Sequence, residues 1–246
     1  MSRFFVEENQ ISGNEIRIVS KRDVKHLTRV LRAARGDRVE VSDSAEWEYE
    51  TEFLRTEDGV AVLRILDRQR FAREPGVRVA LFQGLPKAAK MDAIIQKSVE
   101  LGVDAIFPVA CVRSIAAGDA VSAHKLARWQ KISDEAAKQC RRGLAPKVHP
   151  VLPFDAAVSA MRGFALMLFP YENETERSLK SCLRGLSEKP ADVALIIGPE
   201  GGFAREEAEA LTLAGAVSVS LGGTVLRTET AGPAALAMIL YEFEQV

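Results

Sequence analysis

The pattern of apolar and polar positions divides the chain into two parts, and the change falls near residue 72. In residues 1–71 the apolar residues come in short runs, several of which alternate with charged residues, as in "DRVEVSD", "WEYETEFLR" and "VAVLRILDR". Such runs predict β-strands, whereas "RDVKHLTRVLRA" has apolar residues at helical spacing and predicts a helix. Residues 1–71 are therefore expected to form a small β-rich barrel or sandwich with one helix, and "AREPG" at 72–76 a linker.

From residue 77 onward, strongly apolar strands alternate with helices. The predicted strands are "VRVALFQGL", "DAIFPVA", "FALMLFP", "VALIIGP" and "VSVSLGG". The predicted helices include "KAAKMDAIIQKSVELG", "SAHKLARWQKISDEAAKQC" and the C-terminal "GPAALAMILYEFEQ". Buried apolar strands that alternate with helices are typical of an α/β domain with a mainly parallel sheet. Residues 77–246 are therefore predicted to form one α/β domain.

Three of these strands end in loops of unusual composition: "LFPYENE", "IIGPEGGF" and "SLGGTVLRTET". In open α/β sheets, ligands bind beyond the carboxyl ends of the strands, and glycines there let a ligand approach the backbone closely. The chain contains neither the P-loop motif nor GxGxxG, so phosphate-cradling motifs are missing. The loops predict a pocket for a ligand held through an adenine edge and backbone groups. Tight strand-to-helix turns without a ligand are the competing interpretation.

The same loops carry a family resemblance. "IIGPEGGF" followed by "LGGTVLRTETA" resembles the SPOUT-class methyltransferases, and specifically the family that methylates N3 of a uridine in 16S ribosomal RNA; "GLPKAAKMDAIIQKSVELGV", "EAAKQCRR" and the opening "SRFFV" extend the likeness. It implies a PUA-like RNA-binding β-barrel in residues 1–71, a trefoil-knotted methyltransferase domain in residues 77–246, S-adenosylmethionine as donor, and a homodimer. The chain departs from the family pattern at Ala204, Thr224 and Lys138, where a serine or threonine, an arginine and an acid are usual.

The resemblance assigns the cofactor pocket to the three loops. Glu200 is expected to accept hydrogen bonds from cofactor hydroxyls or to hold its loop; a first-turn carboxylate favoured by the dipole of the following helix is the alternative. The predicted cofactor-binding residues are Phe169, Tyr171 and Glu172 in the first loop, Ile197, Gly198, Glu200 and Gly201 in the second, and Leu221, Gly222, Val225 and Leu226 in the third.

Methylation at N3 of uracil has a chemical requirement that the residues near the third loop could meet. The neutral imide nitrogen is a poor nucleophile, so its proton must leave, and the developing anion must be stabilised. Arg227 is the predicted group that stabilises negative charge on a uracil oxygen, and Glu229 is the nearest candidate base in the sequence. A local ion pair or helix cap at "RTETAGP" explains the same two residues without catalysis.

The charge distribution bears on the partner. The formal net charge is −1, so any nucleic-acid surface must be local. Basic residues concentrate in two segments, Arg17–Arg38 and Lys125–Lys147. A single charge run is typical of a solvated face, but two such runs on a nearly neutral chain favour a phosphate-binding surface. The predicted RNA-binding residues are Arg22, Lys25, Arg29, Arg32, Arg141 and Arg142.

Composition narrows the function class. The three cysteines and three histidines are scattered, which predicts reduced thiols and no metal site. No signal-peptide-like or membrane-spanning apolar stretch is present, so a cytoplasmic protein without membrane contact is expected. The predicted function is S-adenosylmethionine-dependent methylation of N3 of a specific uridine in 16S ribosomal RNA. The RNA is expected to be bound within the small ribosomal subunit, and naked RNA is the alternative substrate. The alternative is a non-catalytic RNA-binding or ribosome-assembly protein that retains the fold; the missing P-loop lysine disfavours a nucleotide hydrolase.

Overall fold

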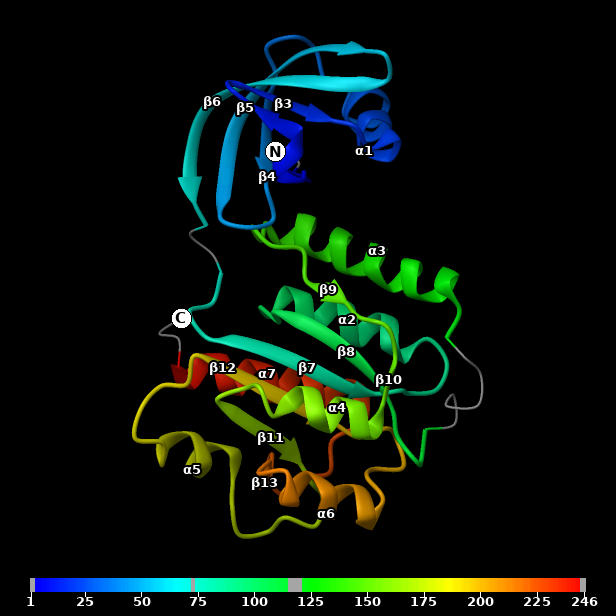
Figure 1. The fold of residues 1–246 in the computed structure, drawn as a ribbon, viewed down its shortest axis with the longest axis vertical. Helices are drawn as coiled ribbons and strands as arrows, with labels where there is room; N and C mark the ends of the chain where they lie inside the picture. Colours follow the sequence, from blue (N-terminus) through cyan, green and yellow to red (C-terminus); the bar gives the residue numbers. More distant parts are fainter. Residues whose placement is uncertain (1–2, 72–73, 115–120, 244–246) are drawn as a thin grey trace. The chain divides into compact units, whose positions relative to one another are not determined.

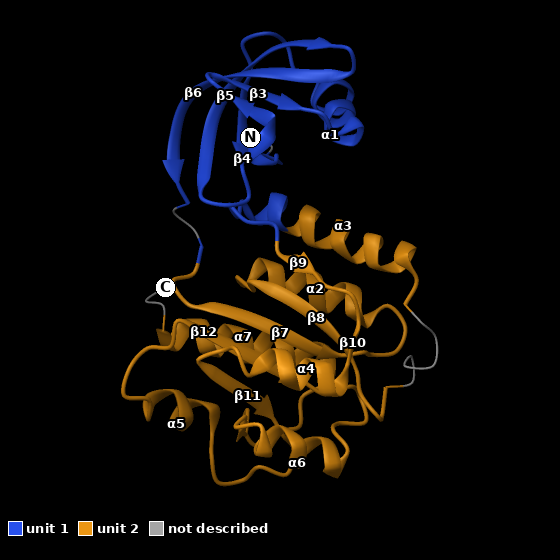
Figure 2. Ribbon diagram, in the orientation of Figure 1, with its two compact units in different colours: residues 1–74, 137–145 blue, residues 75–136, 146–246 orange. Residues whose placement is uncertain are grey.

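The structure is a computed structural model, and it divides the chain into two compact units (Figure 2). Unit 1 comprises residues 1–74 and 137–145, and unit 2 comprises residues 75–136 and 146–246. The start of the predicted linker and the end of the predicted C-terminal helix lie outside the described residues. The described residues are 3–71, 74–114 and 121–243.

Unit 1 is built on a six-stranded mixed sheet in the order β1-β4-β5-β6-β3-β2 (Figure 1). β1 runs parallel to β4, and the other neighbouring strands of this order are antiparallel. β5 and β6 form a long hairpin that turns at Asp58 and Gly59, which have positive φ angles of 50° and 77°, as a two-residue Asp-Gly turn requires. The strands are β1 (Arg3–Phe5), β2 (Ile11–Ser12), β3 (Glu15–Ile18), β4 (Arg38–Ser42), β5 (Trp47–Glu57) and β6 (Val60–Arg70).

The helix expected in the first part of the chain forms in two pieces. α1 (Lys21–Lys25) continues directly into a π-helical turn, η2 (His26–Val30), and a short 3-10 helix, η1 (Glu8–Gln10), precedes both in the chain. Val24 and Leu27 point into the hydrophobic core of unit 1. Only the first half of the apolar stripe is buried, because Val30 and Leu31 at its end are 65% and 42% exposed, and the basic residues of the helix lie on its exposed side.

Unit 2 contains a parallel sheet, as the alternation of strands and helices predicts. Its order is β10-β8-β7-β12-β11-β13, and the short β9 pairs with the first two residues of β8. β12, β11 and β13 are neighbours, so the three loops that follow them lie at one edge of the sheet. The strands are β7 (Arg78–Gly84), β8 (Ala105–Ala110), β9 (Lys147–Val148), β10 (Leu152–Pro153), β11 (Leu166–Pro170), β12 (Asp192–Ile197) and β13 (Val217–Val219).

Helices cover both faces of this sheet (Figure 1). Successive residues of a strand point to opposite faces: Ala80 and Phe82 pack in a core with residues of α4 and α6, whereas Leu81 lies against Gly232 of α7. α7 also packs against α2 and α5. The helices are α2 (Lys90–Glu100), α3 (Ala123–Cys140), α4 (Phe154–Met161), α5 (Leu179–Arg184), α6 (Arg205–Leu213) and α7 (Thr228–Phe243).

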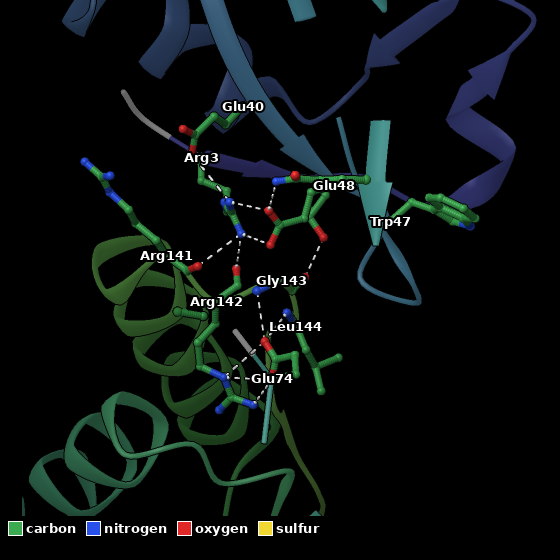
Figure 3. Close-up of polar contacts among 12 residues, drawn as sticks. Arg3, Glu40, Trp47, Glu48, Glu74, Arg141, Arg142, Gly143 and Leu144 are labelled. Atoms are coloured by element: carbon green, nitrogen blue, oxygen red, sulfur yellow. Dashed lines mark hydrogen bonds and ion pairs between the residues drawn. The ribbon is translucent and has the colours of Figure 1, made fainter. Parts of the chain in front are cut away.

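One segment from the middle of the sequence, residues 137–145, belongs to unit 1. It contains the last turn of α3, whose earlier turns belong to unit 2, and the loop that follows. Lys138 Nζ lies 2.7 Å from Asp23 Oδ1, and the Arg3 guanidinium donates to two backbone carbonyl oxygens of the segment (Figure 3). The predicted boundaries differ from the structure here, because the helical periodicity of α3 continues without a break where the helix passes from one unit to the other.

Candidate active site

A cavity of about 820 Å³ opens where β11, β12 and β13 end, and the three predicted loops form its wall. All three loops contribute residues to the lining, so segments far apart in the sequence surround one space. Lys90, at the start of α2, also lines it. The predicted site residues that line the cavity are Tyr171, Glu172, Ile197, Gly198, Glu200, Gly201, Leu221, Gly222, Val225, Leu226 and Arg227.

Phe169 lies beneath the cavity rather than in its wall, which corrects the sequence assignment. Its side chain is 1% exposed and belongs to the core under the site. Its ring packs against those of Tyr171 and Phe203, with centroid distances of 5.9 and 6.2 Å. Phe169 is the penultimate residue of β11 and still points into the core, whereas Tyr171 follows the strand and reaches the cavity. Its role is to support the wall.

The glycines of the second loop allow that loop to fold closely upon itself. A Cβ atom added at Gly198 would lie 3.1 Å from the backbone carbon of Gly202. A Cβ atom at Gly202, where φ is +66°, would lie 2.6 Å from Glu172 Oε1. A larger residue at Gly198 would press on the backbone of the same loop, and one at Gly202 would adopt a left-handed φ and displace the Glu172 side chain, so glycine at both positions favours the sharp break after β12.

The glycines of the third loop serve a different purpose. A Cβ atom added at Gly222 or Gly223 would meet no heavy atom within 4 Å. Gly222 has a φ of +134°, which favours glycine, whereas no positive φ accompanies Gly223. The space beside these two residues is open and borders the cavity, so a ligand can approach their backbone without meeting a side chain.

Glu200 holds its own loop to the start of α2. Its Oε1 and Oε2 accept the backbone N–H of Lys87 at 3.0 and 3.3 Å, and its Oε1 lies 3.0 Å from Lys90 Nζ. Burial raises the pKa of Glu200, but hydrogen bonds from its own N–H, from Lys90 and from Lys87 outweigh that effect and hold the pKa below its ordinary value. The carboxylate is therefore ionised and committed to these donors.

The alternative interpretation of Glu200, as a first-turn carboxylate of the following helix, is wrong. α6 begins only at Arg205, and its first-turn acids are Glu206 and Glu207. Glu207 Oε2 accepts the N–H of Ala204 at 2.8 Å, and its Oε1 accepts the N–H of Val112 at 2.8 Å. The buried Glu207 thus satisfies this helix start, although Ala204 itself offers no capping hydroxyl.

Arg227 lines the cavity in the structure, whereas Glu229 does not. Arg227 is exposed. Glu229 lies in the first turn of α7, with its Oε2 3.1 Å from Lys90 Nζ. Its own backbone N–H, and then Lys90, hold the pKa of Glu229 below its ordinary value, which makes it a weak proton acceptor. This geometry favours the ion-pair and helix-cap interpretation of Glu229 over the role of a base.

Sequence reasoning missed three residues that organise the site: Lys90, Gln83 and Thr228. Thr228 Oγ1 donates to the carbonyl oxygen of Gly198 at 2.7 Å and accepts from Gln83 Nε2 at 2.9 Å. Thr228 is 5% exposed and Gln83 is fully buried. They connect the second and third loops to β7. "GLPKAAK" contains Lys90 and is part of the family resemblance, but nothing in its pattern distinguishes this lysine from its neighbours.

The predicted RNA-binding residues lie in unit 1 and fall into two groups. Arg22, Lys25, Arg29 and Arg32 are exposed on and just after the outer side of α1 and η2. Arg141 is also exposed; its backbone is left-handed, with φ of 60°, and its guanidinium points away from the polar network drawn in Figure 3. These five residues remain candidates for contacts with phosphates.

Arg142 is not a surface residue, and the structure corrects its assignment. It is 5% exposed, and its Nη2 and Nε lie 2.5 and 3.1 Å from Glu74 Oε2 (Figure 3). Glu74 Oε1 also accepts the N–H groups of Gly143 and Leu144, at 2.9 and 3.0 Å. The left-handed backbone at Arg141 turns the two neighbouring side chains apart. Arg141 faces solvent, and Arg142 forms an ion pair inside unit 1.

The two remaining departures from the family pattern also have places in the structure. Thr224 lines the cavity, where the family pattern has an arginine. Lys138 forms its ion pair with Asp23 inside unit 1 and lies 5.6 Å from the centre of the Phe4 ring. Among the described residues, no helix is long and apolar enough to cross a membrane.

Comparison with known proteins identifies relatives along nearly the whole chain. The RNA methyltransferase domain family matches residues 73–240. "Ribosomal RNA small subunit methyltransferase E" of Bacillus subtilis is 32% identical over 250 residues, covering 99% of this chain and 98% of that protein. A crystal structure of the protein of the same name from Neisseria gonorrhoeae, bound to S-adenosyl methionine, superimposes with a TM-score of 0.83 at 30% identity, covering 97% and 96% of the two chains. A putative methyltransferase of Legionella pneumophila, in complex with the same cofactor, gives a TM-score of 0.81 at 30% identity and covers 96% of each chain.

Proposed function

The chain belongs to the RNA methyltransferase domain family, together with the proteins named ribosomal RNA small subunit methyltransferase E that it resembles, and from this premise we propose that it methylates N3 of one uridine in 16S ribosomal RNA. Its cofactor is S-adenosylmethionine, and its activity is methylation of small-subunit ribosomal RNA. The observation that supports the proposal most is the cavity of about 820 Å³ enclosed by the three loops.

The residues of the cavity fit S-adenosylmethionine. Its volume lies within the range of small-molecule sites, which are mostly apolar with a few polar groups. Ile197, Leu221 and Leu226 supply apolar wall for an adenine ring, and the backbone of Gly222 and Gly223 is open to a ligand. Glu172 and Tyr171 add polar groups from the first loop. When bound, the cofactor supplies an electrophilic methyl group.

Arg227 is the residue that we assign to the chemistry of uracil. N3 becomes nucleophilic only after its proton leaves, and the resulting negative charge spreads onto the neighbouring carbonyl oxygens. An exposed guanidinium at the cavity stabilises that charge, and the contact strengthens as the charge develops. Since Glu229 is paired with Lys90, solvent rather than Glu229 accepts the proton in this proposal.

Unit 1 supplies the RNA contacts in this proposal. The basic residues of α1 and η2, together with Arg141, are exposed in the same compact unit, and contacts between such residues and phosphates hold RNA without reading its sequence. The family resemblance further supports a PUA-like RNA-binding domain in residues 1–71, a trefoil knot in residues 77–246 and a homodimer. A substrate within the small ribosomal subunit also implies a cytoplasmic location.

The reaction is tested with the purified protein, labelled S-adenosylmethionine and small ribosomal subunits from cells that lack this protein. Digestion of the RNA to nucleosides should give labelled 3-methyluridine. On the intact RNA, reverse transcriptase should stop at a single position because the methyl group occupies the Watson–Crick edge. Another methylated nucleoside would overturn the N3 assignment. Binding of cofactor and RNA without any transfer would favour a non-catalytic RNA-binding protein instead.

A further inference from the structure

Lys90 lies between two carboxylates that come from different parts of the chain. Its Nζ is 3.0 Å from Glu200 Oε1 and 3.1 Å from Glu229 Oε2. Lys90 is the first residue of α2, Glu200 follows β12, and Glu229 lies in the first turn of α7. The ammonium group of Lys90 therefore joins the second loop of the cavity to α7, the helix that follows the third loop.

The environment of this group differs from that of an ordinary surface ion pair. The side chains of Lys90, Glu200 and Glu229 are 32%, 26% and 24% exposed, so all three are partly shielded from solvent. Lys90 also lines the cavity itself. A second link, in which Thr228 donates to the carbonyl oxygen of Gly198, joins the same two loops without charge. The loops are thus connected by one neutral and one charged link.

We propose that Lys90 is a positioning residue of the cofactor pocket, whose positive charge holds two of the pocket's three sides together by binding one carboxylate from each. The proposal rests on the assignment of the cavity to S-adenosylmethionine. Because both carboxylates lie within about one hydrogen-bond length of the same nitrogen, they are close to each other. Without the cation they would repel, and the loops would separate or one acid would take up a proton.

The charge balance sets the expected pH dependence. Lys90 acts on both acids, and Arg227 is the further charged group that acts on Glu229. In the native protein the pKa values of Glu200 and Glu229 are held below their ordinary values by backbone N–H groups and by Lys90, so both are ionised at neutral pH. Without Lys90, one of the two pKa values rises. Lowering the pH then removes the repulsion, whereas raising the pH restores it.

The test is calorimetric titration of S-adenosylmethionine into the full chain between about pH 5.5 and pH 8.5. Lys90→Met should weaken binding about tenfold at neutral pH, corresponding to about 1.4 kcal/mol, and the loss relative to the native protein should grow as the pH rises. Lys90→Arg, which keeps the cation, should retain most of the affinity. Glu229→Gln added to Lys90→Met should recover affinity, because it removes one of the two repelling charges.

Lys97→Met is the matched control. Lys97 lies on the same helix and pairs with Glu100 at 2.9 Å, but its side chain is 56% exposed, so its loss should leave cofactor binding unchanged. Native affinity in Lys90→Met at every pH would overturn the proposal. A loss that neither Lys90→Arg nor the added Glu229→Gln recovers would also overturn it, because the effect would then not depend on charge.

This experiment separates the role of Lys90 from the proposed function. Cofactor binding is measured without RNA, so a target other than uridine N3 leaves the result standing. A pocket-filling variant, Gly223→Val, tests the cavity directly. If Gly223→Val abolishes binding while Lys90→Met does not weaken it, the pocket assignment holds and the positioning role fails. If neither variant weakens binding, the pocket assignment itself fails.

Discussion

The charged cluster around Arg142 in unit 1 and the one around Lys90 at the cavity differ in how completely they are enclosed. In unit 1 the side chains of Arg142 and Glu74 are 6% and 18% exposed, and Glu74 also accepts two backbone N–H groups. At the cavity Lys90 is 32% exposed and is shared by two acids. A planar guanidinium suits the first arrangement because it binds a carboxylate through two N–H groups, whereas a compact ammonium suits the second.

The comparison shows that a charged residue near a functional motif can have either of two roles. Where donors of the protein itself surround a carboxylate, as they surround Glu74, the charged groups stabilise the fold and have few hydrogen-bonding positions left for a ligand. Where the charges border an open space, as around Lys90, they can respond to what enters it.

Removing the guanidinium in unit 1 should cost the most stability. Arg142→Ala leaves Glu74 without its cation in a largely buried place, and the free energy of unfolding should fall by about 3–5 kcal/mol. Urea denaturation measures the loss, and hydrogen exchange should locate it in residues 3–71 and 137–145. Arg141→Ala, at the neighbouring exposed position, should change stability by less than about 0.5 kcal/mol. If Arg142→Ala kept native stability but bound RNA more weakly, Arg142 would be an RNA-binding residue, as the sequence predicts.

A side chain placed in the open part of the cavity should remove cofactor binding without unfolding the protein. Gly223→Val meets no heavy atom at its Cβ and requires no positive φ, so the affinity for S-adenosylmethionine should fall at least about 100-fold, or about 2.7 kcal/mol. Thermal unfolding should stay close to that of the native chain. Gly198→Val is the contrasting variant, because its Cβ meets backbone of Gly202; it should lower both affinity and stability.

The exposed arginine at the cavity should affect the rate rather than binding. Arg227→Ala should lower kcat about 10- to 100-fold, because its proposed contact strengthens only as negative charge develops. Single-turnover methyl transfer and separate binding titrations measure the two effects. Arg205→Ala, at the exposed start of α6, is the control and should transfer at the native rate. An equal loss of RNA affinity in Arg227→Ala would indicate ordinary substrate binding.

The basic surface of unit 1 should give the smallest change for each residue. Arg29→Ala should weaken RNA binding several-fold. It should also reduce the slope of log Kd against log salt concentration by about 0.7–0.9 for each phosphate that the variant no longer neutralises. Binding measured at several salt concentrations gives this slope. Arg64→Ala, on β6 and paired with Glu52 at 2.7 Å, should leave the slope unchanged. A slope that both variants alter equally would point to a general effect of net charge.

The features that could be predicted from the sequence are those encoded locally. After Asp192, β12 is a run of apolar residues, and Gly198, Pro199 and two further glycines follow it closely, so the sequence alone shows both the buried strand and the break after it. The other two loops follow strands in the same way. Their convergence on one cavity follows from the parallel sheet, in which the carboxyl ends of β11, β12 and β13 lie side by side.

The features that escaped prediction depend on contacts between distant residues. Lys87 and Lys90 both stand at the start of this helix in the sequence, and only the approach of Glu200 and Glu229 to its ammonium group distinguishes Lys90. Arg141 and Arg142 are adjacent in the sequence, which predicts a shared role, but the left-handed backbone of Arg141 turns their side chains in different directions. Phe169 lies within β11, whereas Tyr171 follows its last residue. The position of the strand end therefore decides which ring is in the core and which is at the cavity.

The assignment of residues 137–145 to unit 1 has a consequence for synthesis of the chain. All six strands of that unit precede residue 71, yet Arg3, Asp23 and Glu74 find partners in a segment that is translated much later. On the ribosome, the N-terminal part of the chain must therefore wait for these partners until the end of α3 has left the exit tunnel. A gene fragment that stops at the linker would encode all strands of unit 1 and still lack the piece that completes it.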